Sequence, residues 1–152
     1  MAITYQIESM SQCVDEMSDL WELHWQEIAL DRQKVKLEPD IKTFELLEET
    51  GQLSIVTVRD DGKLVGYHVS LVRPHLHYSS SLTAYVDMYF LHPDYRGGMA
   101  GYKMFKCVEA VLKLRGVQRI YTGTKLHKDM GKLFERLGYN ETERLFVKWI
   151  GD

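Results

Sequence analysis

YVDMYFLHPDYRGGMAG, residues 85–101, is the stretch that decides the fold of this chain. Its apolar start predicts a strand, Pro93 predicts a turn, and a glycine-rich loop then opens a helix. Gly97, Gly98 and Gly101 carry no Cβ, so the backbone can approach a ligand closely at these positions. The start of the helix adds unpaired N–H groups and the positive end of the helix dipole. Together these features predict a site for a phosphate-bearing ligand.

Hydrophobic periodicity and turn residues predict the elements ahead of this stretch. Ser9 and Gln12 have the spacing of a capping box at the start of the first helix, and Pro39 suits the first turn of the second. An Asp-Gly pair at 61–62 between two β-rich runs is a hairpin signal. In chain order we expect a strand over 3–8, a helix over about 12–30, a helix from 39 to 51, strands over 52–59 and 63–72, a polar surface loop over 75–81 and the central strand over 82–91.

The segments that follow alternate between helix and strand patterns. We expect a helix over about 99–115, a strand over 118–124, a helix over 127–137 and one or two strands in the tail, 139–150. The order is therefore β-α-α-β-β-β-α-β-α-β(-β) over a single domain, residues 1–152. This order predicts an α/β (α+β) fold, with a mixed, mostly antiparallel sheet of six to seven strands flanked by about four helices.

The bulk composition is that of an ordinary globular protein, with 152 residues, 45% hydrophobic and 27% charged. The net charge of −3 gives no cationic field that would suggest nucleic acid as a partner. Two cysteines do not make a disulfide framework, and no apolar run is long enough to span a bilayer. We therefore expect a cytoplasmic protein with no nucleic-acid or membrane partner.

With this order of elements, the chain resembles the GCN5-related N-acetyltransferase (GNAT) superfamily. The likeness rests on FLHPDYRGGMAG (90–101), on the amphipathic helix behind it and on KLFERLGY (132–139). The resemblance implies acetyl-CoA as cosubstrate, with the strand-end residues Phe90 and Leu91 against its pantetheine arm and thioester. It also implies that the loop N–H groups hold the pyrophosphate, from Arg96, Gly97, Gly98, Met99, Ala100 and Gly101. Met99 departs from the family pattern, which usually has glycine at that position.

Such proteins transfer the acetyl group by direct attack of an amine on the thioester, which requires a base, an oxyanion donor and an acid. Asp87 is the first candidate for the base, because 85, 87, 89 and 91 share one face of a strand and burial would raise the pKa of a carboxylate there. A buried Asp paired for structural reasons is the alternative. The backbone N–H of Leu91 is the candidate donor. Phe134 stands where relatives often have a tyrosine acid, so Tyr89 and Tyr139 are possible substitutes and the acid is unassigned.

Candidates for the acceptor pocket come from two regions: His24 and Glu27 on the first long helix, and His75 and Tyr89 around the central strand. Each also has a plain packing or solvent-exposed interpretation. His127 occupies the place of a pantetheine-binding Asn in similar proteins. His75 and His77 lack a third ligand, so we predict no metal site.

We therefore predict an acyl-CoA-dependent N-acetyltransferase that acts on a primary amine of a small molecule or protein. An acetyl-CoA-binding module with little or no turnover is the alternative. The identity of the amine acceptor is left open by the sequence. The C-terminal strands leave room for a homodimer formed by strand exchange or sheet extension.

Overall fold

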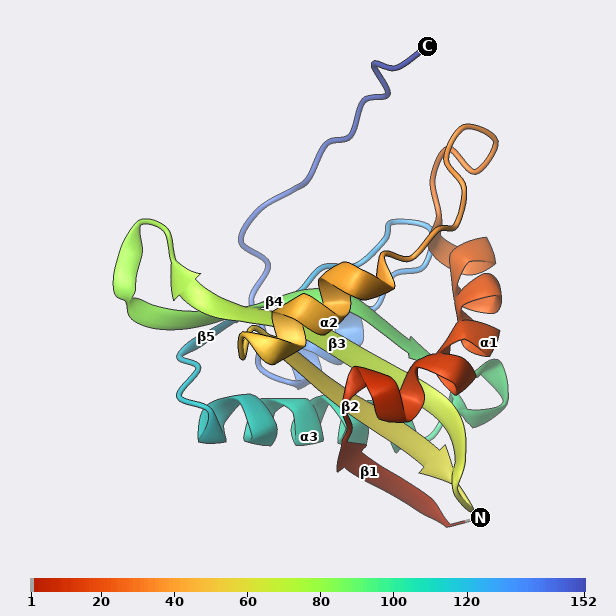
Figure 1. Cartoon of the computed structure of the whole chain (residues 1–152), viewed down its shortest axis with the longest axis vertical. Coiled ribbons are helices and arrows are strands. Elements are labelled where there is room, and N and C mark those ends of the chain that lie inside the picture. The colour runs from red at the N-terminus through yellow and green to blue at the C-terminus, as the bar shows by residue number, and fades with distance from the viewer. Residues whose placement is uncertain (1) are drawn as a thin grey trace.

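The computed structural model describes residues 2–152. Its elements are β1 (Ile3–Ile7), α1 (Met10–Ile28), α2 (Ile41–Glu49), β2 (Leu53–Asp60), β3 (Lys63–His75), β4 (Tyr78–Leu91), the 3-10 helix η1 (Pro93–Tyr95), α3 (Ala100–Leu114), β5 (Arg119–Tyr121) and α4 (Gly131–Arg136). They form one five-stranded sheet in the order β1-β2-β3-β4-β5 (Figure 1). The first four strands pair antiparallel, and β5 lies parallel to β4. The predicted fold class and the single β4-α3-β5 crossover are confirmed.

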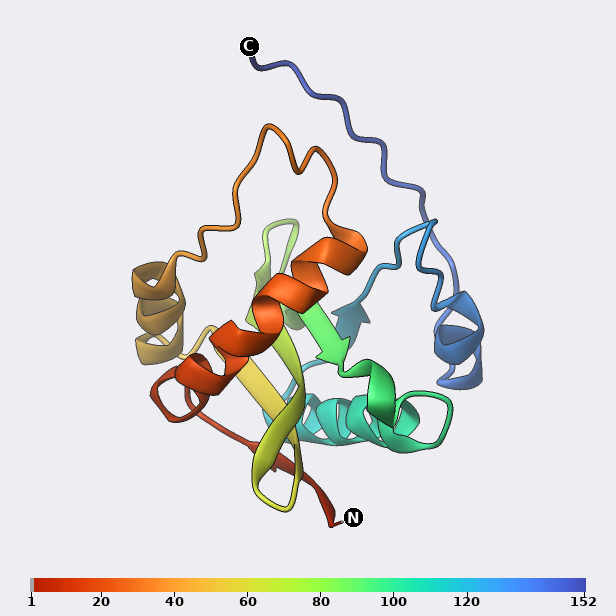
Figure 2. The same cartoon turned by 90° about the vertical axis from the view of Figure 1, so that its right-hand side faces the viewer.

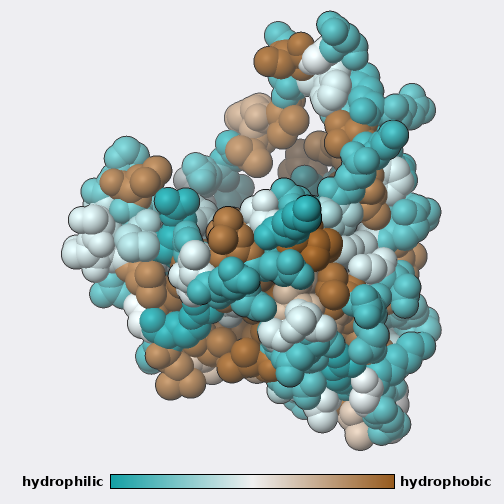
Figure 3. All heavy atoms as spheres, in the orientation of Figure 1, coloured by the Kyte–Doolittle hydropathy of each residue, from teal (hydrophilic) through white to brown (hydrophobic). Residues whose placement is uncertain are grey.

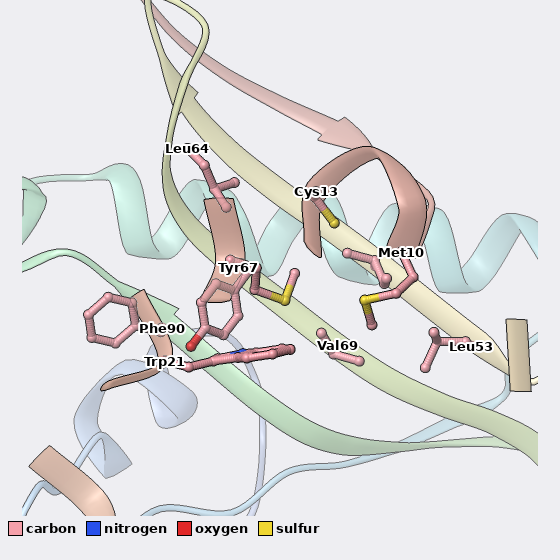
Figure 4. Packing of buried hydrophobic residues seen from close by; sticks show 10 residues of the cluster. Met10, Cys13, Trp21, Leu53, Leu64, Tyr67, Val69 and Phe90 are labelled. Carbon is pink, nitrogen blue, oxygen red and sulfur yellow. The ribbon is translucent and has the colours of Figure 1, made fainter. Parts of the chain in front are cut away.

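Helices cover both faces of this sheet. Figure 2 shows α1 and α2 on one side and α3 and α4 on the other. The core beneath α1 is apolar: Met10, Cys13 and Trp21 form one buried cluster with Tyr67 and other strand residues (Figure 4). A second cluster beneath α3 and α4 includes residues of β2, β3 and β4. The sheet is thus buried on both faces, which is why every residue over 53–59 in β2 and over 64–70 in β3 is buried.

The helix starts follow the local sequence. The Ser9 N–H donates to Gln12 Oε1 at 2.7 Å, so the predicted capping box is present. The N-cap of α2 is Asp40, whose carboxylate accepts the Thr43 N–H at 3.1 Å. Pro39 therefore lies just ahead of the helix instead of in its first turn, because Asp40 holds the N-cap position.

The prediction of a polar surface loop over 75–81 is wrong. β3 continues to His75 and β4 begins at Tyr78, so the two strands are joined by a tight turn at Leu76 and His77. Cross-strand stacking helps to hold this end of the hairpin, since the rings of His75 and Tyr78 lie 4.8 Å apart. Strand pairing satisfies the backbone of this polar segment and overrides its weak periodicity.

The C-terminal prediction is also wrong in part, because residues 2–152 form five strands and not six or seven. From 140 to 152 the chain is extended but pairs with no strand of residues 2–152, and it runs away from the body of the molecule (Figure 1). α4 is shorter than the predicted helix over 127–137, and β5 is only three residues long. No helix among residues 2–152 is long and apolar enough to cross a membrane.

Candidate active site

One edge of β4 is open at its C-terminal end. β5 pairs with β4 only along Thr83, Ala84 and Tyr85. Beyond Tyr85, the edge of β4 that faces away from β3 has no neighbouring strand among residues 2–152. Six residues of a central strand, 86–91, thus present backbone groups on this side without a strand partner. An extended ligand with amide groups can pair with such an edge.

The orientation of the Leu91 backbone follows from its neighbours. The His92 N–H donates to the Val65 carbonyl of β3 at 2.8 Å. Successive residues of a strand direct their N–H and C=O groups to opposite edges, so those of Leu91 point away from β3. The Leu91 carbonyl is indeed bonded on that side, by the Arg96 Nε–H at 2.7 Å. The Leu91 N–H therefore faces the open edge and can donate to a ligand there.

The glycine-rich loop lies between this edge and α3. Gly97 has φ +87°, a left-handed conformation that favours glycine, and a Cβ on Gly98 would meet nothing within 4 Å. A Cβ on Gly101 would lie 3.9 Å from Leu91 Cδ2, an ordinary contact. The Cα of Gly101 therefore faces the side chain of Leu91 at the end of the strand.

The N–H groups of the loop are available from Gly97 onward. The Arg96 N–H already donates to the Pro93 carbonyl at 3.1 Å, which corrects its predicted place in the phosphate-binding set. The backbone hydrogen bonds of α3 begin with Lys103 N–H donating to Met99 O at 2.9 Å. Residues 100–102 therefore have N–H groups that the helix itself does not use. This is the arrangement that binds a phosphate.

The Arg96 side chain connects the loop to α1. Its guanidinium donates to both carboxylate oxygens of Glu27 at 2.9 Å, as well as to the Leu91 carbonyl. It also lies 5.4 Å from the Phe90 ring. Arg96 thus fixes the backbone of the strand end, and Glu27 fixes Arg96. The Glu27 carboxylate, predicted to border the acceptor pocket, is already paired in this structure.

Arg136 is a residue that sequence reasoning missed. It lies at the end of α4, and its guanidinium is 3.7 Å from the Met99 sulfur and 4.9 Å from the Tyr102 ring. This exposed cation therefore stands beside the start of α3 and adds to the positive potential of the loop. The sulfur of Met99, at the position where the family pattern usually has glycine, contacts the Arg136 guanidinium. Nothing in the local pattern around Arg136 signals this role, because the residues that it meets are more than thirty positions away.

A β-bulge changes the predicted face of Asp87. The register passes from Val69↔Met88 to Ser70↔Val86, so Asp87 is the extra residue. Tyr85 pairs with Leu71, which packs toward α1, whereas Tyr89 packs on the α3 side. The prediction that 85, 87, 89 and 91 share one face is therefore wrong.

Asp87 is also exposed in the free chain, contrary to the expected burial. Its carboxylate still loses part of its hydration to neighbouring atoms, and this desolvation raises its pKa above the ordinary value. An Asp with a raised pKa beside an open strand edge is a suitable proton acceptor.

Tyr89 spans the gap that the divergence of β4 and β5 leaves. Its hydroxyl donates to the Gly123 carbonyl at 2.8 Å, in the connection from β5 to α4. Burial raises the pKa of its hydroxyl above the ordinary value for tyrosine. Its ring packs edge-on against Phe134 with 5.8 Å between centroids, and Phe134 in turn contacts Tyr139. Tyr89 thus places a hydroxyl group beside Phe134, whose own side chain has no proton to donate to a leaving thiolate.

The three histidines proposed from sequence occupy different settings. His24 is buried and hydrogen-bonded to the Tyr67 hydroxyl at 2.7 Å, and burial lowers its pKa to about 4. His75 is the last residue of β3 and pairs with Tyr78 in the hairpin. His127 lies in the exposed connection ahead of α4, and its Nε2 is 3.0 Å from the Glu27 carbonyl oxygen. Within residues 2–152, no group of three His, Cys, Asp or Glu side chains could hold a metal ion.

Comparisons with known proteins bear on the family and the fold of this chain. A sequence profile of the acetyltransferase (GNAT) family matches residues 13–139. A comparison with curated protein sequences finds no significant match.

Several solved structures share the fold over nearly the whole chain. Ribosomal-protein-alanine N-acetyltransferase from Brucella melitensis biovar Abortus 2308 has a TM-score of 0.73 at 18% identity, covering 99% of this chain and 100% of that one. AAC(6')-Iy, in complex with the bisubstrate analog CoA-S-monomethyl-acetylneamine, gives 0.70 at 16% identity, with 100% of both chains covered. Glucosamine-6-phosphate N-acetyltransferase from Arabidopsis thaliana gives 0.74 at 11% identity, covering 99% and 100%. At these identities the likeness is one of fold.

Proposed function

Because this chain belongs to the GNAT family of acetyltransferases, we propose that it transfers an acetyl group from acetyl-CoA to a primary amine by direct attack on the thioester. The observation that carries the proposal is the open edge of β4, where the Leu91 N–H faces outward next to the glycine-rich loop. The Arg96 side chain links the loop to the strand end at Leu91, so one extended ligand can place its thioester at the strand end and its pyrophosphate at the loop.

The residues present fit acetyl-CoA as cosubstrate. The loop N–H groups after Arg96 and the start of α3 offer donors to the pyrophosphate, and Arg136 adds a positive charge. The edge of β4 from 86 to 91 offers backbone groups to the amides of the pantetheine arm. The Leu91 N–H donates to the thioester oxygen, where negative charge develops as the amine attacks.

The proton of the attacking amine goes to Asp87 in this proposal. A new C–N bond forms as the C–S bond breaks, and the thiolate leaves as CoA. The raised pKa of Asp87 brings it closer to that of the ammonium proton that it must accept. Tyr89 is the proposed donor to the thiolate; its hydroxyl would turn to the leaving sulfur from the Gly123 carbonyl to which it donates in this structure. The acceptor is a primary amine that the site geometry alone does not specify.

A thiol-release assay over a panel of amines tests the activity. We expect amine-dependent release of CoA thiol from acetyl-CoA, and a rise in melting temperature with CoA. A melting temperature that millimolar CoA leaves unchanged would contradict both the enzyme and the simple binding module. A rise without thiol release from any amine would favour the binding module.

Asp87→Asn tests the base. We expect at least a hundredfold lower kcat with a CoA affinity within about twofold of wild type, because general-base catalysis contributes roughly 10²–10⁴-fold. Asp19→Asn, an exposed aspartate on α1, is the matched control and should retain full activity. The wild-type rate should fall as the pH drops through the raised pKa of Asp87. A normal rate in Asp87→Asn would remove this residue from the mechanism.

A further inference from the structure

A groove lies at the hairpin end of β3 and β4. Its volume is about 340 Å³, which is the size of a small-molecule site. Residues 73–77 of the hairpin line it, together with Leu71 and Tyr85, and no acidic side chain of residues 2–152 is part of the lining. The hairpin projects past the end of α2 in Figure 1, and the same part of the surface is mostly white and teal in Figure 3. The groove is therefore an open and largely polar site.

The strand register brings two arginines together on this part of the sheet. Thr83 of β4 pairs with Arg73 of β3 on one side and with Arg119 of β5 on the other. Residues that pair across strands direct their side chains to the same face of a sheet. Both arginines are exposed, and neither forms an ion pair with a carboxylate of residues 2–152. In a chain with a net charge of −3, this face thus offers two guanidinium groups to an anion.

Two tyrosine rings lie along the strands between these arginines and the proposed base. Tyr85 pairs with Tyr121, and their rings are stacked with 4.9 Å between the centroids. The Arg119 guanidinium donates to the Tyr121 hydroxyl at 3.1 Å, which fixes its position beside the rings. Tyr85 comes two residues after Thr83, on the same face, and two residues before Asp87. The stacked pair therefore forms a flat surface that leads from the arginines towards Asp87.

His75 adds a hydrogen-bond donor to the groove. The His77 N–H donates to His75 Nδ1 at 3.0 Å, so a neutral His75 carries its proton on Nε2. This second nitrogen is then a donor and not an acceptor. Together with the two arginines, it makes the groove suited to a negatively charged group of a ligand.

We propose that the amine acceptor of this chain is a small molecule that also carries an anionic group, a carboxylate or a phosphate, bound by Arg73 and Arg119. This assignment rests on the proposed acetyl transfer, because it names the substrate class of the same site. Asp87 follows Thr83 by four residues, which is about 13 Å at roughly 3.3 Å per residue. An α-amino acid is too short to reach both places, whereas a longer molecule with the amine and the anion at opposite ends can do so. A polycationic amine would be repelled by both arginines.

A thiol-release assay with three amines of equal length tests the substrate class. Aminooctanoic acid carries an amine and a carboxylate at opposite ends, octylamine lacks the carboxylate, and diaminooctane replaces it with a second cation. We expect kcat/KM to be roughly tenfold higher for aminooctanoic acid than for octylamine, and lowest for diaminooctane. High salt should reduce this preference, because both arginines are exposed. Equal values for the three amines, or a preference for the diamine, would overturn the proposal and leave acetyl transfer intact.

Arg73→Gln combined with Arg119→Gln tests the two residues. We expect the ratio of kcat/KM for aminooctanoic acid to that for octylamine to fall about fivefold, and Arg73→Lys with Arg119→Lys to retain most of the ratio. Lys63→Gln is the matched control, since it removes an exposed cation at the other end of β3 and should leave the ratio unchanged. A ratio that survives the double glutamine change would overturn the assignment.

An aminoalkyl phosphonate of the same length distinguishes the two kinds of anion. A higher kcat/KM for the phosphonate than for aminooctanoic acid would assign the group as a phosphate, and a lower value would assign it as a carboxylate. Both results support an anionic acceptor, whereas turnover of the phosphonate and of aminooctanoic acid no faster than that of octylamine would exclude one.

Binding measured without turnover separates this proposal from acetyl transfer itself. Aminooctanoic acid titrated into the isotope-labelled full chain with CoA should shift the amide NMR signals of 73–77 and 119–121. The double glutamine variant should lose these shifts. Shifts without thiol release from any amine would support the anion site and contradict acetyl transfer. Signals of the groove that do not respond to aminooctanoic acid would overturn the anion site, whatever the turnover.

Discussion

Glu27→Gln tests whether the ion pair between α1 and the glycine-rich loop prepares the chain for its cosubstrate. Glu27 accepts two hydrogen bonds of 2.9 Å from Arg96, and the same guanidinium holds the Leu91 carbonyl at 2.7 Å. The substitution removes the charge and one of the two acceptors but keeps the size of the side chain. Arg96 then loses the partner that fixes its orientation, and the strand end at Leu91 loses its support.

The size of the effect follows from the exposure of the pair. A hydrogen bond to a charged group contributes about 1.5–3 kcal/mol when buried. Here the side chains of Arg96 and Glu27 are 31% and 18% exposed, so solvent screens part of this energy. We therefore expect a loss of about 1–2 kcal/mol, which corresponds to roughly 5- to 30-fold weaker binding if the loop must be ordered before CoA binds.

Isothermal titration with CoA measures the binding, and urea unfolding of the free protein measures the stability. Glu22→Gln is the control, since Glu22 lies on the same helix and its recorded hydrogen bond is to the neighbouring Gln26 side chain. It should change neither quantity. The reasoning would be refuted by a Glu27→Gln protein that binds CoA within twofold of wild type and unfolds at the same urea concentration.

Two further predictions concern stability. A Cβ on Gly66 would lie 2.9 Å from Leu91 Cδ1 and from a backbone carbonyl, so Gly66→Ala should cost about 1–3 kcal/mol in urea unfolding, whereas Gly98→Ala, in open space, should not. Burial acts to raise the Glu8 pKa, but hydrogen bonds from Arg59 and a threonine outweigh it and leave the pKa lowered. Glu8→Gln should therefore destabilise by about 3 kcal/mol at pH 7. Its deficit should shrink as the pH falls below about 4, where wild type loses this contribution; a deficit constant with pH would contradict the ion pair.

The parts of the site that are continuous in sequence were predictable. The strand end at Leu91, the turn at Pro93 and the glycine at 97 act through their own backbone conformations, which depend on residues a few positions away. The capping box at Ser9 is of the same kind. Helical and strand periodicity likewise predicted the fold class, because each pattern reports a face that must be buried.

The bulge at Asp87 depended on tertiary structure. It arises from the register between β3 and β4, which the sequence of β4 alone does not contain. One extra residue reverses the alternation, so an argument from odd and even positions fails beyond it. The tight turn after His75 was missed for a related reason: pairing with the facing strand gave order to a polar segment with little pattern of its own.

The sequence by itself determined the fold class, most of the order of elements and the glycine-rich loop ahead of α3, since each of these is encoded by neighbouring residues. Tertiary structure alone decided that Glu27 meets Arg96 across 69 positions and that Arg136 stands beside Met99 across 37. Such contacts depend on how whole helices pack against the sheet, and no local pattern carries that information. The tail is the intermediate case, because its residues predict a strand but a strand forms only where another one lies beside it.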